Sequence, residues 1–351
     1  MAYTTINKHS DYFKNKLFTG TGADNNAVTG VGFRPDLLWI RQRNAMSHRL
    51  YDVIRGVNAA LNVDNTAVES QYTQYGQLES FDSDGFTVGA GTSNGHGTNE
   101  NGQSIVSWNW LAGGSAGSSN TDGTINTTYT SVNTTAGISI STYTGNNTAN
   151  ATFGHGLGAV PKVVIIKNRG ATNSWIVKMP STTDGYFYLD TPDAISSSSG
   201  WMPVSSSTVT LANQWTAYNG NGANYVAYCF AEKTGFSKFG KYTGNSSTDG
   251  TFVYTGFKPS FLMIKRTDST NNWLMYDNKR SAFNVTDDYL LADASDAEVT
   301  NNSGQALDLL SNGFKIKNSN LGSNASGGSY IYMAFAESPL VGTNNIPSVA
   351  R

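Results

Sequence analysis

Cysteine is almost absent from this chain, and so is any concentration of charge. Its 351 residues include a single cysteine, Cys229, which excludes an intrachain disulfide and a cysteine-based zinc cluster. Charged residues make up 14% of the chain, against about 25% in typical proteins. The formal net charge is −2 and there is no basic block, so nucleic acid is not an expected partner.

Long apolar runs are also missing. No stretch of about 18 apolar residues occurs, which argues against membrane insertion. Residues 1–11 are polar and lack the apolar centre of a secretory signal, so synthesis in a cytoplasm without a signal peptide is expected. No segment sustains an apolar period of 3.6 residues, so long helices are not expected either.

Glycine, serine, threonine and asparagine fill the chain, and aromatic residues reach 12%. Short continuous apolar runs at residues 37–40, 163–166 and 261–264 predict strands that are buried on both faces. Asp84-Gly85 and Asn312-Gly313 predict tight hairpin turns, because glycine tolerates the positive φ that such turns require. The composition and these signals together predict an all-β protein.

One series of signals occurs three times in the same order. Each series opens with an aromatic residue, threonine and glycine, at residues 18–20, 143–145 and 242–244. The opening glycine precedes a proline by 15, 16 and 15 residues, at Pro35, Pro161 and Pro259. Residues 225–232 align with residues 330–337 at the end of the second and third series. A repeat of this kind indicates the architecture of the whole chain, so it is interpreted before the other signals.

The repeat predicts three tandem β-sandwiches of the jelly-roll or lectin-like kind. The expected divisions are unit 1 at residues 1–112, unit 2 at 138–236 and unit 3 at 237–338. Residues 113–137 are nearly all Gly, Ser, Thr, Asn and Ala, which indicates a linker or long loop. Residues 339–351 are expected to form an extended tail, either loose or docked on a neighbouring subunit.

Charged groups have structural interpretations throughout. Asp52 near Arg55 recurs as Asp277 near Arg280, which indicates structural ion pairs. The cations after the central strands, among them Arg41, are interpreted as surface charges at strand ends, and the acidic residues within 287–298 as a solvated loop. No histidine pair, nucleophile elbow or complete calcium loop occurs, so no catalytic residue, metal or cofactor is assigned.

Exposed aromatic side chains can stack on sugar rings. Trp201 and Trp215 have no counterpart in the other two series, so they are the candidates for a glycan-stacking surface.

The chain resembles repeat-bearing virion proteins of tailed bacteriophages, notably marine cyanophages. The resemblance is carried by Gly256-Phe257-Lys258-Pro259, by Met263-Ile264-Lys265-Arg266 and by the two aligned endings at residues 225–232 and 330–337. Those proteins are commonly labelled tail-fibre or structural proteins. The resemblance covers nearly the whole chain and implies no catalytic residue.

The resemblance therefore implies a non-enzymatic, homo-oligomeric virion component, made in the host cytoplasm and located at the tail. It would attach to a host-surface glycan and contact other virion proteins. The alternatives are a capsid-decorating or head-fibre protein, a carbohydrate-binding module, and a glycan depolymerase.

Overall fold

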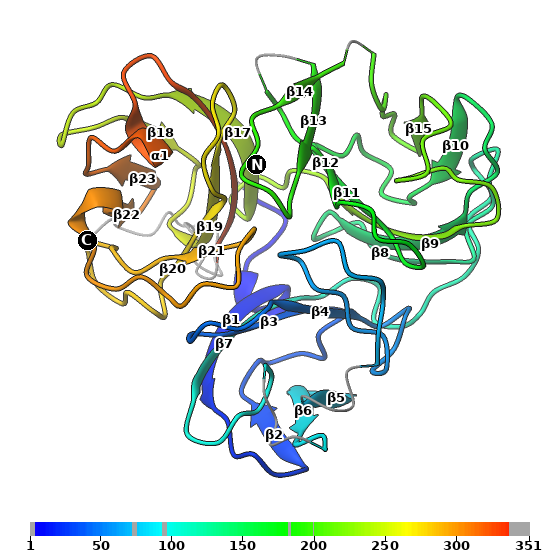
Figure 1. The fold of residues 1–351 in the computed structure, drawn as a ribbon, viewed down its shortest axis with the longest axis horizontal. Coiled ribbons are helices and arrows are strands. Elements are labelled where there is room, and N and C mark those ends of the chain that lie inside the picture. Colours follow the sequence, from blue (N-terminus) through cyan, green and yellow to red (C-terminus); the bar gives the residue numbers. More distant parts are fainter. Residues whose placement is uncertain (1–3, 72–75, 93–96, 182–183, 199, 337–351) are drawn as a thin grey trace.

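A computed structural model of the chain describes residues 4–71, 76–92, 97–181, 184–198 and 200–336. The expected tail at residues 339–351 lies outside these ranges. The described chain forms three lobes around a common centre, as Figure 1 shows. Strands β1–β7 build the first lobe, β8–β16 the second and β17–β24 the third. The all-β class predicted from the sequence is therefore confirmed.

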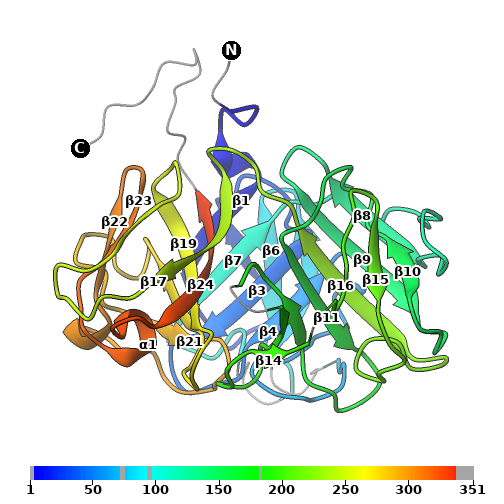
Figure 2. The ribbon, with the colours of Figure 1, turned by 90° about the horizontal axis from the view of Figure 1, so that it is seen from above.

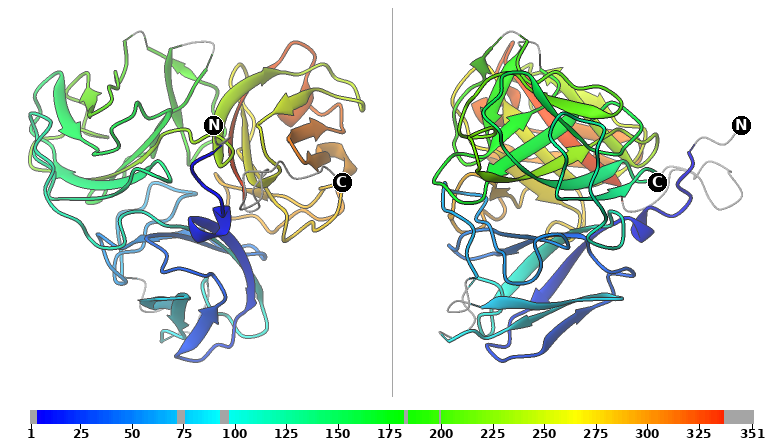
Figure 3. Two further views of the ribbon diagram at one scale, coloured as in Figure 1. Left: turned by 180° about the vertical axis from the view of Figure 1, so that it is seen from behind. Right: turned by 90° about the vertical axis from the view of Figure 1, so that its right-hand side faces the viewer.

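The first lobe contains a large and a small sheet, both antiparallel. In sheet order, the large one holds β1 (Phe13–Thr19), β7 (Ser104–Trp110), β3 (Leu37–Gln42) and β4 (Arg49–Asp52). The small one holds β2 (Asn26–Thr29), β6 (Gly85–Gly89) and β5 (Gln77–Asp82). The short η1 (His9–Asp11) stands on one face of the molecule, seen in Figures 2 and 3.

The second lobe has a seven-stranded sheet. Its order is β14 (Ser196–Ser197), β13 (Gly185–Tyr188), β12 (Ile176–Lys178), β11 (Val163–Asn168), β16 (Asn224–Phe230), β9 (Ile138–Thr144) and β8 (Tyr129–Asn133). Its small sheet pairs β10 (Ala151–Gly154) with β15 (Thr208–Leu211).

The third lobe has a five-stranded sheet of β17 (Ser237–Thr243), β24 (Ser329–Ala336), β19 (Pro259–Arg266), β20 (Leu274–Asp277) and β21 (Leu290–Leu291). Its small sheet holds β18 (Phe252–Tyr254), β23 (Gly313–Ile316) and β22 (Leu307–Leu310). Two single-turn elements, η2 (Ser303–Gln305) and α1 (Leu321–Asn324), complete this lobe.

The large sheets share one strand order. In each lobe the closing strand lies between the opening strand and the central apolar strand, as β7 lies between β1 and β3. The three apolar runs form β3, β11 and β19, and all but the last residue of β19 are buried. The prediction of strands buried on both faces is confirmed, because one face contacts the centre and the other faces the small sheet.

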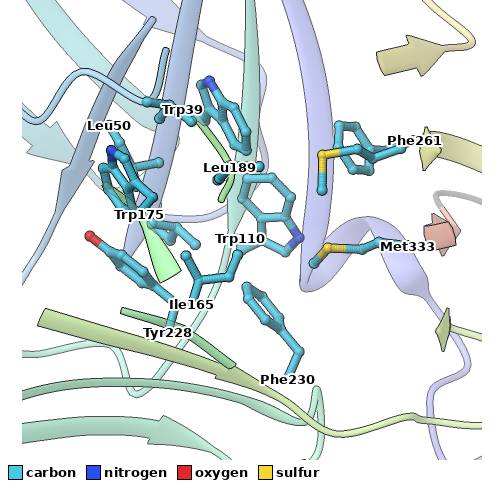
Figure 4. Close-up of a pocket in the computed structure, with 13 residues that line it drawn as sticks. Trp39, Leu50, Trp110, Ile165, Trp175, Leu189, Tyr228, Phe230, Phe261 and Met333 are labelled. Atoms are coloured by element: carbon cyan, nitrogen blue, oxygen red, sulfur yellow. The ribbon is translucent and has the colours of Figure 1, made fainter. Parts of the chain in front are cut away.

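The centre of the molecule is a single apolar core to which all three lobes contribute. Phe335 packs its ring against Phe13 of the first lobe and Phe230 of the second, at centroid distances of 5.3 and 5.9 Å. A cavity of about 30 Å³ remains here, lined by apolar side chains and Tyr228 (Figure 4). That volume is enough for about one water, but a water needs two or more polar partners. The cavity is a packing void and carries no candidate site.

Neighbouring lobes are joined by a ring N–H that donates across each boundary. Trp175 Nε1 donates to the carbonyl of Asn62 at 2.8 Å, and Trp273 Nε1 donates to that of Tyr188 at 2.9 Å. At the third boundary His48 Nε2 lies 2.8 Å from the carbonyl oxygen of Leu291. The Trp39 indole donates to His48 Nδ1, so Nε2 carries the proton and donates as the two indoles do.

Three cations expected at the surface are buried instead. Arg41, Lys167 and Lys265 are fully buried, so the interpretation as strand-end surface charges was wrong. Lys167 Nζ donates to the carbonyl of Thr66 at 3.0 Å, and Lys265 Nζ to that of Pro192 at 2.7 Å. Burial lowers the pKa of both lysines to about 8. These cations tie loops of the preceding lobe to the central strand.

The segment at residues 113–137 contains a strand that the linker interpretation did not anticipate. Tyr129–Asn133 forms β8, the edge of the seven-stranded sheet, and Ser118 makes a bridge to Thr130. The composition of this segment concealed the strand, because a high content of Gly, Ser, Thr and Asn is also typical of loops. In the strand, threonine and serine hydroxyls form hydrogen bonds with neighbouring side chains. The Thr130 hydroxyl, for example, lies 3.0 Å from that of Ser141.

The opening glycine of each series touches the backbone of another loop. A Cβ built on Gly244 would lie 2.4 Å from the carbonyl oxygen of Ala325, with similar clashes at Gly20 and Gly145. We expect Gly244→Ala to lower the free energy of unfolding by about 2 kcal/mol, since backbone cannot yield as a side chain can. Gly170→Ala, where nothing lies within 4 Å, is the matched control. Equal urea midpoints for the two variants would contradict this reading of the motif.

Candidate functional site

The repeated Asp–Arg pairs are buried ion pairs, as the sequence indicated. Arg55 Nε lies 2.5 Å from Asp52 Oδ2, and Arg280 Nε lies 2.6 Å from Asp277 Oδ2, with all four side chains fully buried. Each aspartate also accepts from the neighbouring lobe. The hydroxyl of Tyr228 donates to Asp52 at 2.8 Å.

Two glutamates extend these pairs across the lobe boundaries. Glu69 joins Arg55 at 3.0 Å to Arg169 of the second lobe at 2.7 Å. Glu298 lies 2.9 Å from Arg280 and also pairs with Arg43 of the first lobe. Glu298 and Asp293 were expected in a solvated loop, and both are instead buried partners. The sequence could not reveal this, because the groups that they contact lie in other elements.

Three aspartates repeat one further contact. Asp64, Asp190 and Asp293 accept from the backbone N–H of His48, Trp175 and Trp273 at 2.9–3.0 Å. Burial raises the pKa of all three carboxyls, and that of Asp293 reaches about 6. These groups therefore hold loops beside the ring N–H donors that join the lobes.

The raised pKa of Asp293 gives stability a pH dependence of definite sign. Between the usual 3.8 and about 6 the folded chain holds a proton that the unfolded chain has lost, so stability falls as pH rises through this window. We expect Asp293→Asn to remove up to about 3 kcal/mol of that fall, because an amide does not titrate in this pH range. The amide oxygen of Asn can still accept the hydrogen bond from the backbone N–H of Trp273. Urea unfolding at pH 4 and pH 7 measures this pH dependence. Parallel pH profiles for the two proteins would count against it.

Among the described residues, neither the histidines nor the turn at Asp84-Gly85 forms a group of side chains that could hold a metal ion. His155 is buried and accepts from the backbone N–H of Leu157 at 3.1 Å. Asp84 accepts from the N–H of Gly30 at 2.9 Å, at the hairpin that joins β5 to β6. The turn interpretation of this dipeptide is confirmed.

The structure places Trp201 and Trp215 in one aromatic cluster of the second lobe. Both rings pack on Tyr186, at 5.0 and 5.2 Å, and both contact Tyr218. Trp201 is only 2% exposed, whereas Trp215 is half-buried. Of the two candidates, only Trp215 has an appreciable face toward solvent, and its binding of a glycan stays a prediction.

A more exposed aromatic surface lies on the small sheet of the third lobe. On β18, Val253 points into the core, so Phe252 and Tyr254 point outward, with exposed fractions of 45% and 57%. At the other edge of this sheet, the bridge between Thr286 and Leu307 brings residues 283–286 beside β22. Phe283 in that segment is 86% exposed. We name Phe252, Tyr254, Leu310, Phe283 and Val285 the outer aromatic surface.

The other two lobes lack these aromatic residues at the same places. The edge strand of the small sheet ends in Thr29 in the first lobe and Gly154 in the second, where the third lobe has Tyr254. Two residues earlier, Ala27 and Thr152 stand where the third lobe has Phe252. Core packing does not require aromatic residues at outward positions, so this difference marks the third lobe.

Sequence reasoning missed this surface because it searched for tryptophan. The alternation Phe252-Val253-Tyr254 beside the turn at Asp249-Gly250 was a usable signal for a strand with one aromatic face. Aligning the three edge strands would then have singled it out, but their boundaries were not identifiable from the sequence.

These features define the class of protein: an all-β body of three lobes around one core, closed by buried interlobe contacts. Across residues 8–339 the chain matches the model of a family described as a domain of unknown function, DUF7483, and it belongs to that family. The comparisons find no matching curated protein and no matching solved structure. No helix of the described residues is long and apolar enough to cross a membrane.

Proposed function

We propose that this chain is a non-enzymatic virion component of a tailed bacteriophage, a tail-fibre or tail-associated protein that attaches the particle to the host surface. In this proposal each lobe is a β-sandwich repeat of the jelly-roll or lectin-like kind. The separate apolar cluster between the large and small sheet of each lobe supports that description. The resemblance to repeat-bearing phage proteins supports the setting.

The observation that carries the proposal is the outer aromatic surface. The two repeated Asp–Arg pairs are buried within the body, whereas large apolar side chains of the third lobe face solvent. Several exposed apolar side chains on one sheet face are typical of binding sites. A binding role therefore accounts for the arrangement better than hydrolysis does.

Immunogold electron microscopy of the intact virus, with antibody raised against this chain, tests the proposal. Gold at the tail is the expected result. Gold spread over the head would move the protein to the capsid-decorating alternative. No gold on any particle would overturn the virion role, and turnover of host polysaccharide by the purified chain would overturn the non-enzymatic one.

A further inference from the structure

A polar cleft opens on the second lobe, where β11 ends and β16 begins. Its volume is about 360 Å³, toward the lower end of the range of about 300–1,000 Å³ for small-molecule sites. The floor is backbone with small side chains, from Gly170, Ala171, Gly222 and Ala223. Apart from its chain neighbours, no atom lies within 4 Å of a Cβ built on Gly170 or on Gly222, so the floor is open.

The first lobe fills the equivalent place with two side chains. The carbonyl of Gln103 accepts from the N–H of the opening glycine of its lobe, as the carbonyl of Ala223 does in the second lobe, so these two residues are equivalent. Asn44 and Gly170 are also equivalent, because the residue before each donates its N–H to the first residue of the closing strand. The Asn44 amide donates to Gln103 Oε1, and this pair occupies the place that Gly170 and Ala223 leave open.

The third lobe lacks the arginine that stands beside the cleft. By the same backbone bond, Thr267 corresponds to Arg169. The next residue, Asp268, makes an ion pair with Arg266 at 2.8 Å, where the second lobe has a glycine. In the described part of the chain, only the second lobe combines the arginine with an open floor.

The sides of the cleft carry donors and acceptors. Glu69 holds the Arg169 guanidinium at Nε and Nη2, at 2.9 and 2.7 Å, and Arg169 Nη1 has no hydrogen-bond partner among the described residues. Asn224 is exposed, and its Oδ1 accepts from the Thr144 hydroxyl at 3.0 Å, which leaves Nδ2 as a donor. Glu69 Oε1 accepts from Arg169 alone, so it can accept a second hydrogen bond. Hydroxyl groups, which both donate and accept, match this set.

The charges at the cleft are balanced. Glu69 also pairs with Arg55 at 3.0 Å, and Arg55 pairs with Asp52. With Arg169, two cations and two anions form one network. An anionic ligand would meet an arginine whose charge is already compensated, so the network favours a neutral ligand.

We propose that this cleft binds one neutral sugar unit, whose hydroxyl groups form hydrogen bonds with Arg169 Nη1, Asn224 Nδ2 and Glu69 Oε1. The buried Arg55 holds the Arg169–Glu69 pair in place before a ligand arrives, which lowers the ordering cost of binding. The cleft is separate from the outer aromatic surface. The inference therefore goes beyond the proposed function, because a sugar site of this kind does not require a virion.

Saturation-transfer NMR titrations of the full chain with glucose, galactose, mannose and N-acetylglucosamine test the inference, with glucuronate as the charged comparison. We expect at least one neutral sugar to bind. Gly170→Asn/Ala223→Gln should weaken that binding at least tenfold at an unchanged melting temperature, because it installs the pair that fills the first lobe. Asn224→Ala, which removes one donor from an exposed position, should weaken it as well. The reciprocal variant Asn44→Gly/Gln103→Ala leaves the cleft untouched and is the control that should keep wild-type binding.

Three results would overturn the inference: no neutral sugar of the panel binds, glucuronate binds more tightly than the neutral sugars, or the filled cleft binds as well as the open one. Particle labelling separates these results from the proposed function. Sugar binding with no gold on particles would reject the virion role alone, and gold at the tail without sugar binding would reject the cleft site alone.

Discussion

Replacing Arg280 with methionine should lower the free energy of unfolding by about 3–5 kcal/mol. The Arg280 guanidinium pairs with Asp277 at 2.6 Å and Glu298 at 2.9 Å, and Nη2 donates to the carbonyl of Met275 at 2.9 Å. It also lies over the ring of Trp108, whose indole donates to Asp277 at 3.2 Å. Without the cation, a buried carboxylate at the boundary of two lobes loses its charge partner.

Two further variants make this expectation specific. Asp277→Met/Arg280→Met should lose less stability than Arg280→Met, because removing both partners leaves no unpaired aspartate. Arg266→Met should cost less than about 1 kcal/mol, since its partner Asp268 is at the surface. Urea unfolding of the four proteins gives the comparison. If the double variant were as unstable as the single one, the loss would come from packing and not from unpaired charge.

The second lobe shows that such a pair can be replaced. The register of β11 and β12 ends with Lys178 opposite Val164, so the next residue, Met179, corresponds to Asp52, which lies opposite Leu37, and to Asp277, which lies opposite Phe261. Met179 is buried in the central core. Nearby, the backbone N–H of Ile195 donates to the carbonyl of Thr267, as the backbone N–H of Glu298 donates to the carbonyl of Arg43. The boundary between the second and third lobes therefore has an apolar side chain at the position where another boundary has a glutamate. One boundary has thus exchanged charge for apolar packing without loss of the common geometry.

Local signals in the sequence were sufficient for the strands and insufficient for their assembly. The buried central strands and the Asp84-Gly85 hairpin follow from apolar runs and turn chemistry, which act over a few residues. Burial of Lys167 depends on Thr66, a carbonyl about one hundred positions earlier in the chain. No pattern within one repeat contains that partner, so the charge was assigned to solvent.

Contacts between distant segments also explain why the sequence did not locate the exposed aromatic residues. Trp201 was singled out as specific to one repeat, but its burial depends on Tyr186 of β13 and on Tyr218 in the turn before β16. The outer aromatic surface was accessible only after strand register had assigned Tyr254 and Thr29 to equivalent positions. Register depends on which face of each strand is buried, and that burial comes from segments far apart in the sequence.

Phe335→Ala should lower the free energy of unfolding by about 3–5 kcal/mol and shift one cooperative transition as a whole. The Phe335 ring is fully buried and contacts Phe13, Trp110 and Phe230 as well as rings of its own lobe. The cavity that alanine leaves therefore removes contacts from all three lobes at once. Differential scanning calorimetry measures both the shift and the number of transitions.

This result separates a shared core from independent tandem domains. If each lobe folded alone, Phe335→Ala would displace only the part of the heat absorption that belongs to the third lobe, and the remainder would stay in place. Phe283→Ala, a change of the same chemistry at 86% exposure, should leave the whole profile unchanged. We expect a single displaced peak, because Phe261, Met263 and Met333 of the third lobe complete the same apolar cluster as Trp110 and Phe230 of the other two.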